Sequence, residues 1–190
     1  GAHAVPMEFK RNVDEYVDSV TEENMPKVAA LELAEFCDVF CDRGIFNMEQ
    51  AKRVLTCAKR LGLKQKIHAD RMSTFGGAEI AADVGAVSAD HLNFSSAEGI
   101  KAMAEKGVVG VMLPGATFNM MMNRYPDARF MIDCGVPVAL GTDFNAGNWI
   151  LNMQLIISMA CRFMRITPAE AITAATINAA HAICRAGEVG

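Results

Sequence analysis

Five short apolar runs recur along this chain, each bounded by glycine or polar residues. Their first residues stand 21 to 28 positions apart, which is close to the combined length of one strand, one helix and two loops. Apolar runs without polar alternation are typical of strands buried on both faces of a parallel sheet. The spacing therefore predicts five consecutive strand–helix units, with strands over residues 37–41, 65–68, 86–90, 108–113 and 136–141.

Helix start signals lie between these runs. In a capping box, a residue such as Ser, Thr or Asn is followed three positions later by Glu or Gln, and the two satisfy the first free N–H groups of a helix. Three such pairs occur: Asn47 with Gln50, Ser95 with Glu98, and Thr167 with Glu170. They predict a helix over 48–61, a helix that ends at Gly107, and an Ala-rich C-terminal helix.

A parallel α/β chain either closes into an eight-stranded barrel or stays an open, doubly wound sheet. A complete barrel takes about 250 residues, so the 190 residues here accommodate only part of one. The Rossmann form of the open sheet has a G-x-G-x-x-G turn after its first strand, and no strand end here carries it. We expect residues 1–190 to form one domain, an incomplete (β/α)8 TIM barrel of five to six units, with residues 2–5 ending a further strand. The open sheet is the alternative.

Composition excludes several classes of protein. The chain has 18 Lys and Arg against 22 Asp and Glu and no basic cluster, so nucleic acid and membrane surfaces are not expected partners. No apolar run reaches the roughly 18 residues of a membrane-spanning helix, and the opening residues lack the features of a signal peptide. The six cysteines form no C-x-x-C pair, which favours buried, reduced thiols. We expect a cytoplasmic protein.

Polar side chains stand at the ends of three predicted strands. His68 and His91 end two of them, and Asp143 follows the last. Because parallel strands gather functional groups at their carboxyl ends, the three side chains are predicted to share one mouth. Taken singly, each has a structural explanation as a hydrogen-bonding or capping group. Together they are the residue types that bind Zn²⁺ or a similar ion and move protons from its water. His181, within an Ala-rich helix, is interpreted as a packed or surface histidine.

Longer motifs resemble the imidazolonepropionase family of the amidohydrolase superfamily. They cover essentially the whole chain: GAHAVP, VFCD, KIHAD, GGAE, GAVSADHL, LPG, PVALGTDFN and TPAEAITAATINAA. The resemblance implies a metal-dependent hydrolase of histidine catabolism that opens the ring of 4-imidazolone-5-propanoate to give N-formimidoyl-L-glutamate. It also implies a (β/α)8 barrel with a small β-sandwich, one zinc or iron ion, a small-molecule substrate and a homodimeric full-length protein.

The resemblance also implies roles for individual residues. His68 and Asp143 match metal ligands, and His91 matches the histidine beside the metal-bound water. Asp143 is then expected to transfer protons, and His91 to stabilise the anionic centre that forms during ring opening. The positions that match substrate contacts are His3, Asn145, Gly147 and Asn148.

Two departures from the family pattern are visible. The H-x-H metal pair of the first barrel strand is absent, so His68 and Asp143 alone are expected to hold metal poorly, and we expect the chain to be part of a longer protein. Where the family has Glu after H-A-D, this chain has Arg71, a cation without an acceptor. Arg71 is expected to turn away, to pair with Asp70 or Asp42, or to bind an acidic substrate. The alternatives are an amidohydrolase for another cyclic amide or amidine, and a non-catalytic barrel fragment.

Overall fold

The computed structural model describes residues 1–190. Its strands are β1 (Phe36–Cys41), β2 (Lys64–Ala69), β3 (Ser88–His91), β4 (Val109–Met112) and β5 (Val138–Leu140). The helices before β1 are η1 (Met7–Phe9), α1 (Val13–Asp18), the π-helix η2 (Ser19–Asn24) and α2 (Met25–Ala30). The remaining helices are α3 (Met48–Arg60), α4 (Gly77–Val84), α5 (Ala97–Lys106), α6 (Pro114–Asn119), α7 (Ala128–Asp133), α8 (Met153–Phe163), α9 (Pro168–Ala175) and α10 (Ile177–Ala182).

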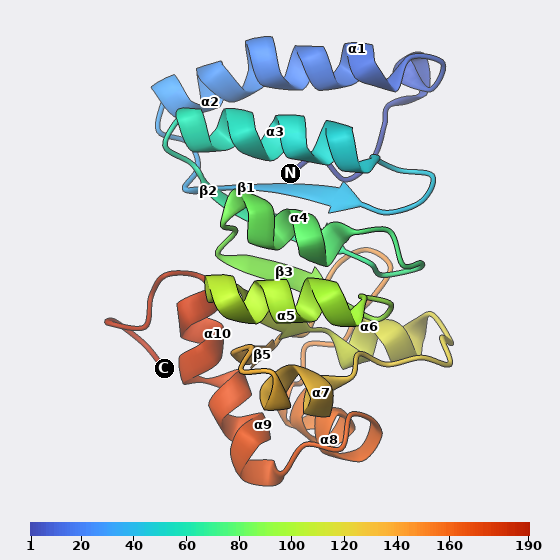
Figure 1. The fold of residues 1–190 in the computed structure, drawn as a ribbon, viewed down its shortest axis with the longest axis vertical. Coiled ribbons are helices and arrows are strands. Elements are labelled where there is room, and N and C mark those ends of the chain that lie inside the picture. Colours follow the sequence, from blue (N-terminus) through green and yellow to red (C-terminus); the bar gives the residue numbers. More distant parts are fainter.

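The five strands form one sheet in which spatial order equals chain order and every pairing is parallel. Crossovers between parallel strands are right-handed, so a sheet that always advances in one direction places its connecting helices on one face. Helices α3, α4 and α5 lie side by side on that face (Figure 1). A doubly wound sheet reverses its strand order at a switch point, and this sheet does not, so the doubly wound alternative is wrong. The fold is an incomplete, TIM-barrel-like α/β sheet.

The chain start extends this sheet by a single residue pair. Ala2 forms an isolated parallel bridge with Val39 of β1. Its N–H donates to the Asp38 carbonyl at 2.8 Å, and its carbonyl accepts from the Phe40 N–H at 2.9 Å. The prediction that residues 2–5 end a further strand is confirmed for this bridge, and the bridge fixes His3 beside β1.

The last three strands are shorter than predicted because their first apolar residues belong to helix ends. The N–H groups of Ala86, Val108 and Val136 donate to carbonyls of the preceding helices at distances of 2.9 to 3.0 Å. These bonds satisfy C-terminal helix carbonyls that lack an intrahelical partner. Ladder pairing therefore begins one or two residues later than the apolar runs suggest.

Two of the three predicted helix starts are confirmed. Asn47 and Gln50 form a reciprocal capping box at α3, and Thr167 and Glu170 form another at α9. The third prediction was wrong by one residue, because Ser96 rather than Ser95 caps α5 by accepting from the Gly99 N–H.

The Ala-rich C-terminal helix is divided into two helices, which the sequence analysis did not predict. Thr176, between α9 and α10, has φ −119° and ψ −98°. Its hydroxyl donates to the Ile172 carbonyl at 2.8 Å, an interaction that competes with the helical backbone bond.

The break allows α10 to turn onto the sheet. Ala182 of α10 packs with Val109 and Ala139. Strand register places these two residues on the same face as His68, which we call the inner face.

The cysteines are all free thiols, but only half of them are buried as expected. Cys37, Cys41 and Cys57 are buried, whereas Cys184 is exposed. Burial raises the pKa of Cys37 to about 11 and that of Cys41 to about 12, so these two thiols stay protonated at neutral pH.

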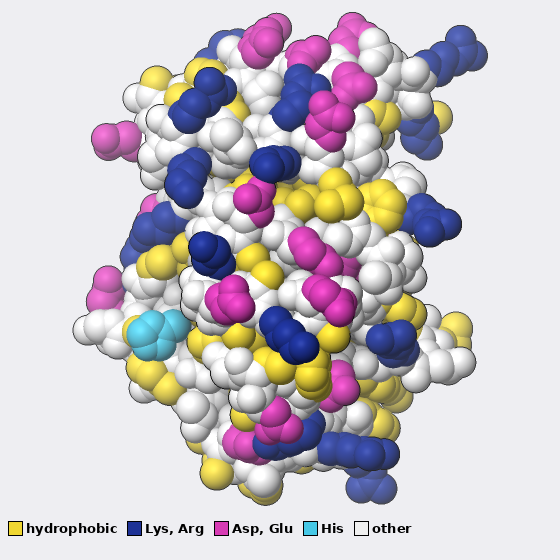
Figure 2. All heavy atoms as spheres, viewed as in Figure 1, with side chains coloured by type: hydrophobic (Ala, Val, Ile, Leu, Met, Phe, Trp, Pro, Cys, Tyr) yellow, Lys and Arg dark blue, Asp and Glu magenta, His cyan; other side chains and the backbone are white.

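The surface over the helices carries charges of both signs, interspersed rather than grouped (Figure 2). None of the helices combines the length and the hydrophobicity needed to cross a bilayer.

Candidate metal centre

The predicted site residues lie along one rim of the sheet. His68 is the next-to-last residue of β2, His91 is the last residue of β3, and Asp143 follows β5 by three residues. The strands are parallel, so all three residues belong to the carboxyl edge, where parallel α/β proteins build their active sites.

The three side chains converge. One ligand atom from each of His68, His91 and Asp143 can be chosen so that all lie within 4.8 Å of one another. The ring centroids of the two histidines are 4.9 Å apart. His91 is buried, with 1% of its surface exposed, and His68 and Asp143 are partly buried. The convergence on which the sequence argument depended is therefore present.

The backbone at this rim is conformationally unusual. Positive φ angles occur at Asp70 (49°), His91 (78°), Leu92 (61°) and Asp143 (53°), which follow or end three strands. Non-glycine residues rarely adopt this left-handed region, and each costs about 1–3 kcal/mol when the surroundings enforce it. Such strain concentrates at functional sites. It is consistent with selection for side-chain placement at this edge.

Several buried polar atoms at the rim have no hydrogen-bond partner within the chain. They include Nδ1 of His68, Nε2 of His91, Oδ2 of Asp143 and Oδ1 of Asp38. Buried polar atoms are nearly always paired, and each unpaired one costs roughly 1–3 kcal/mol. Unpaired imidazole and carboxylate atoms that face one another fit a bound cation, which accepts electron pairs from both kinds of atom.

Electrostatics distinguish the two histidines. Burial lowers the pKa of His91 to about 2, and the positive charges of His68 and Arg71 act in the same direction. Burial also acts to lower the pKa of His68, but contact with Asp38 outweighs it and raises that pKa above its ordinary value. His91 is thus a neutral imidazole at physiological pH, and His68 is an imidazole held against a carboxylate.

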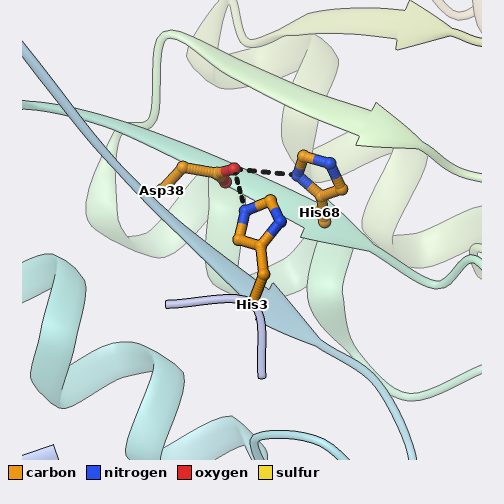
Figure 3. A group of neighbouring side chains, drawn as sticks. All are labelled: His3, Asp38 and His68. Carbon is orange, nitrogen blue, oxygen red and sulfur yellow. Dashed lines mark hydrogen bonds and ion pairs between the residues drawn. The ribbon is translucent and has the colours of Figure 1, made fainter. Parts of the chain in front are cut away.

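Asp38 is a site residue that the sequence analysis missed. It lies in the middle of β1, and one of its oxygens, Oδ2, contacts two histidines (Figure 3). His3 Nε2 lies 2.5 Å from this oxygen, and His68 Nδ1 lies 2.9 Å from it. A signal was available, because Asp38 is the one charged residue of the otherwise apolar strand FCDVFC. Burying a charge in a strand is costly and calls for a partner.

The loop after β5 holds the backbone around Asp143. The side-chain amide of Asn148 donates to the carbonyls of Thr142 and Asp143, at 2.9 and 3.0 Å. The amide of Asn145 donates to the Asp143 carbonyl at 2.7 Å, and its oxygen accepts from the Gly147 N–H at 2.8 Å. These contacts give both asparagines a role in placing Asp143.

Arg71 makes no ion pair with Asp70 or Asp42. Its guanidinium Nη2 lies 2.7 Å from the sulfur of Met120. The two carboxylates are already occupied by backbone N–H groups and serine hydroxyls. An ion pair of Arg71 with Asp70 or Asp42 is therefore excluded. The expectations that Arg71 turns away or binds an acidic substrate remain. The remaining histidine, His181, is exposed on α10, so of the packed and surface interpretations the surface one holds.

Comparison with known proteins shows what the chain is similar to. No family model matches the chain. An imidazolonepropionase of Geobacillus kaustophilus (strain HTA426) is 56% identical, and one of Alkaliphilus oremlandii (strain OhILAs) is 50% identical, each over 100% of this chain. One of Streptococcus sanguinis (strain SK36) is 43% identical, again over 100% of this chain. The chain is similar to imidazolonepropionases along its full length. It spans 45% of the length of these three relatives.

Solved structures support the fold of this imidazolonepropionase-like chain. An amidohydrolase from an environmental sample of the Sargasso Sea has a TM-score of 0.69 and 21% identity, over 92% of this chain and 42% of its own. A zinc-bound adenosine deaminase from Xanthomonas campestris has a TM-score of 0.65 and 20% identity, over 80% of this chain and 39% of its own. At such identities the likeness shows a shared fold alone.

The donor set of this imidazolonepropionase-like chain is chemically suited to a metal. Two imidazoles and one carboxylate make three N and O ligand groups, the number a catalytic zinc site keeps while leaving a position open. The H-x-H pair of the family is absent, since the four histidines are His3, His68, His91 and His181. Metal affinity within this chain therefore depends on His68 and Asp143, with His91 as an additional donor in the same cluster.

Proposed function

We propose that the protein carrying this chain opens the imidazolone ring of 4-imidazolone-5-propanoate by hydrolysis, giving N-formimidoyl-L-glutamate in histidine degradation. The observation that carries the proposal is the convergence of His68, His91 and Asp143 at one rim of an amidohydrolase-type sheet. Whole-chain identity of 43–56% to imidazolonepropionases supports this substrate in particular.

His68 and Asp143 are the proposed metal ligands in this chain. Their N and O donors suit zinc and iron alike. When bound, either ion supplies an activated water at neutral pH. The unpaired Oδ2 of Asp143 supports this assignment, because a ligand atom needs an electron pair that the fold does not use.

Asp143 and His91 are the proposed catalytic residues. The Asp143 carboxylate can accept the proton of the attacking water and deliver it to the departing ring nitrogen. His91, with its pKa lowered to about 2, is neutral at physiological pH. It therefore acts on the developing oxyanion of the substrate as a hydrogen-bond donor rather than as a charge. Removal of such a donor typically lowers the rate by about 10²–10³.

The substrate-binding residues proposed are His3, Asn145, Gly147, Asn148 and Arg71. His3 stands beside His68, with its side chain 43% exposed and therefore accessible from solvent. Arg71 lowers the pKa of His91 through its charge, which indicates that the guanidinium acts on the rim. An arginine at this position suits a carboxylate-bearing substrate. It is also the observation that favours the second candidate, a hydrolase of a different acidic cyclic amide or amidine.

The location and assembly of the protein are proposed from its thiols and from the family resemblance. Six free thiols suit a reducing compartment, which supports the cytoplasm. A homodimer is proposed from the resemblance to the family.

The proposal is tested in the complete protein with His68→Ala and Asp143→Asn. Asn tolerates the left-handed backbone at position 143, so the second variant changes charge with little change in shape. We expect each variant to lose bound zinc or iron and to lose hydrolysis of 4-imidazolone-5-propanoate, measured by metal analysis and by absorbance of the ring. His181→Ala and Asp83→Asn, both at exposed positions, are matched controls that should retain metal and activity.

Two results would count against the proposal. Unchanged metal content in both site variants would remove the metal assignment. A wild-type protein that binds metal and hydrolyses another cyclic amide, but leaves 4-imidazolone-5-propanoate intact, would replace the first substrate by the second candidate.

A further inference from the structure

Asp38 is a partly buried acidic residue whose surroundings the proposed function does not explain. Its side chain is 19% exposed, yet it stands in the middle of β1 with apolar neighbours in the strand. Oδ1 has no partner, and Oδ2 contacts His3 and His68. A carboxylate that served only the fold would be expected to use both oxygens. Asp38 directs one oxygen at two imidazoles.

The two ring nitrogens of His68, Nδ1 and Nε2, have different surroundings. Nδ1 lies 2.9 Å from Oδ2 of Asp38 in an ion-pair contact that lacks the alignment of a hydrogen bond, and the same ring takes part in the cluster with His91 and Asp143. A negatively charged oxygen this close to Nδ1 favours, by its charge, the tautomer that carries its proton there. Nε2 is then left with the lone pair. Histidines that bind metal commonly have their other nitrogen held by a carboxylate, which fixes the tautomer and the orientation of the ring.

We propose that Asp38 is a positioning residue that holds the proton of His68 on Nδ1, so that Nε2 presents its lone pair toward His91 and Asp143. The same oxygen binds Nε2 of His3 at 2.5 Å, and the rings of His3 and His68 are 4.3 Å apart. Asp38 therefore connects the proposed metal ligand with the proposed substrate contact. What this arrangement is for rests on the proposed function. The arrangement itself rests on the distances between Asp38, His3 and His68.

The first test uses the complete protein without metal and needs no activity. The ¹⁵N signals of the His68 imidazole are assigned with the His68→Gln variant. Above the pH at which the rings titrate, wild-type His68 should show the tautomer with Nδ1 protonated. Asp38→Ala should shift His68 toward the Nε2-protonated form, whereas Asp38→Asn, which keeps an acceptor oxygen, should retain the wild-type tautomer. Asp83→Ala, at an exposed position, is the control.

A second measurement connects the tautomer to the metal. Titration with Zn²⁺ alone should show an affinity for Zn²⁺ about 10- to 100-fold lower in Asp38→Ala than in wild type. A loss of this size is typical when a residue that contacts a metal-binding histidine is removed. Circular dichroism at the titration temperature establishes that the variant is folded.

The outcomes separate the inference from the proposed function. An unchanged His68 tautomer in folded Asp38→Ala would overturn the inference whether or not the protein is an enzyme. A shifted tautomer in a chain whose complete protein leaves 4-imidazolone-5-propanoate intact would support the inference and contradict the proposed function. If Asp38→Asn and Asp38→Ala shift the tautomer equally, an acceptor oxygen is not what holds the proton, and the inference also fails.

Discussion

Asp70 and Asp143 occupy nearly equivalent places in the fold and differ in how their carboxylates are used. Both follow a strand at the same rim, and both adopt a left-handed backbone, with φ of 49° and 53°. Asp70 is fully buried and accepts four hydrogen bonds. Asp143 has a buried oxygen that accepts none. Position at the rim therefore does not by itself mark a carboxylate for the proposed site. The two carboxylates differ in how many hydrogen bonds their oxygens accept.

The partners of Asp70 explain why it belongs to the fold. Its oxygens accept from the N–H groups of Phe75, Gly77 and Ala78 and from the Ser95 hydroxyl, at 2.8 to 3.1 Å. Two of these N–H groups open helix α4, where a negative charge is favourable. Asp70 thus joins the end of β2 to the start of α4 and to the loop after β3.

The largest effect is expected from Asp70→Ala. The substitution leaves three backbone N–H groups and one hydroxyl without an acceptor, so we expect the free energy of unfolding to fall by about 3 kcal/mol or more. Urea denaturation followed by circular dichroism measures the change. Asp83→Ala, at an exposed position, should stay within about 0.5 kcal/mol of wild type. A loss for Asp70→Ala as small as that of the control would mean that its hydrogen bonds do not stabilise the fold.

The opposite sign is expected from Asp143→Asn in the same metal-free chain. The substitution removes a charge whose buried oxygen has no partner and keeps a residue that tolerates positive φ. We expect the free energy of unfolding to stay unchanged or to rise by up to about 1 kcal/mol, because functional carboxylates are commonly held at a cost to stability. The same urea titration applies. If Asp143→Asn destabilises the chain as much as Asp70→Ala does, the comparison between the two carboxylates fails.

Much of the fold was predictable because its signals are local. The capping boxes at Asn47 and Thr167 are formed by residues three positions apart, and the apolar runs are continuous in the sequence. The error at α5 has a local cause too, since Ser95 and Ser96 are adjacent and either hydroxyl can cap a helix. In the structure the Ser95 hydroxyl instead donates to Asp70, which lies 25 positions earlier.

The site was predictable only in part, because its remaining components depend on tertiary contacts. His68, His91 and Asp143 were found from their places at strand ends, which parallel topology brings together. Asp38 lies mid-strand, and its role appears only when β1 pairs with β2 and the chain start brings His3 to the same oxygen. No spacing rule relates residue 3 to residues 38 and 68.

The smallest effect is expected at Glu170, a carboxylate with several partners that lies at the surface. It accepts from Arg129 Nη2 at 2.6 Å and from the Thr167 backbone N–H at 2.7 Å. The bond with Arg129 and the bonds with Thr167 lower the pKa of Glu170 from its ordinary value of 4.5 to about 2. A carboxyl group whose pKa is lower in the folded state stabilises the fold above its unfolded pKa, and this contribution is lost as the pH falls from about 4.5 through 2.

Glu170→Gln should therefore lower the Tm slightly at pH 7, and the difference from wild type should shrink as the pH is lowered from 5 to 3. Thermal melts at a series of pH values measure this, with Glu105→Gln on the exposed surface of α5 as the control. Solvent screens such surface pairs, so a small effect is expected despite the number of partners. A loss at Glu170 as large as that at Asp70 would show that partner number alone determines the contribution of a carboxylate. A loss confined to Asp70 would show that burial has to accompany the partners.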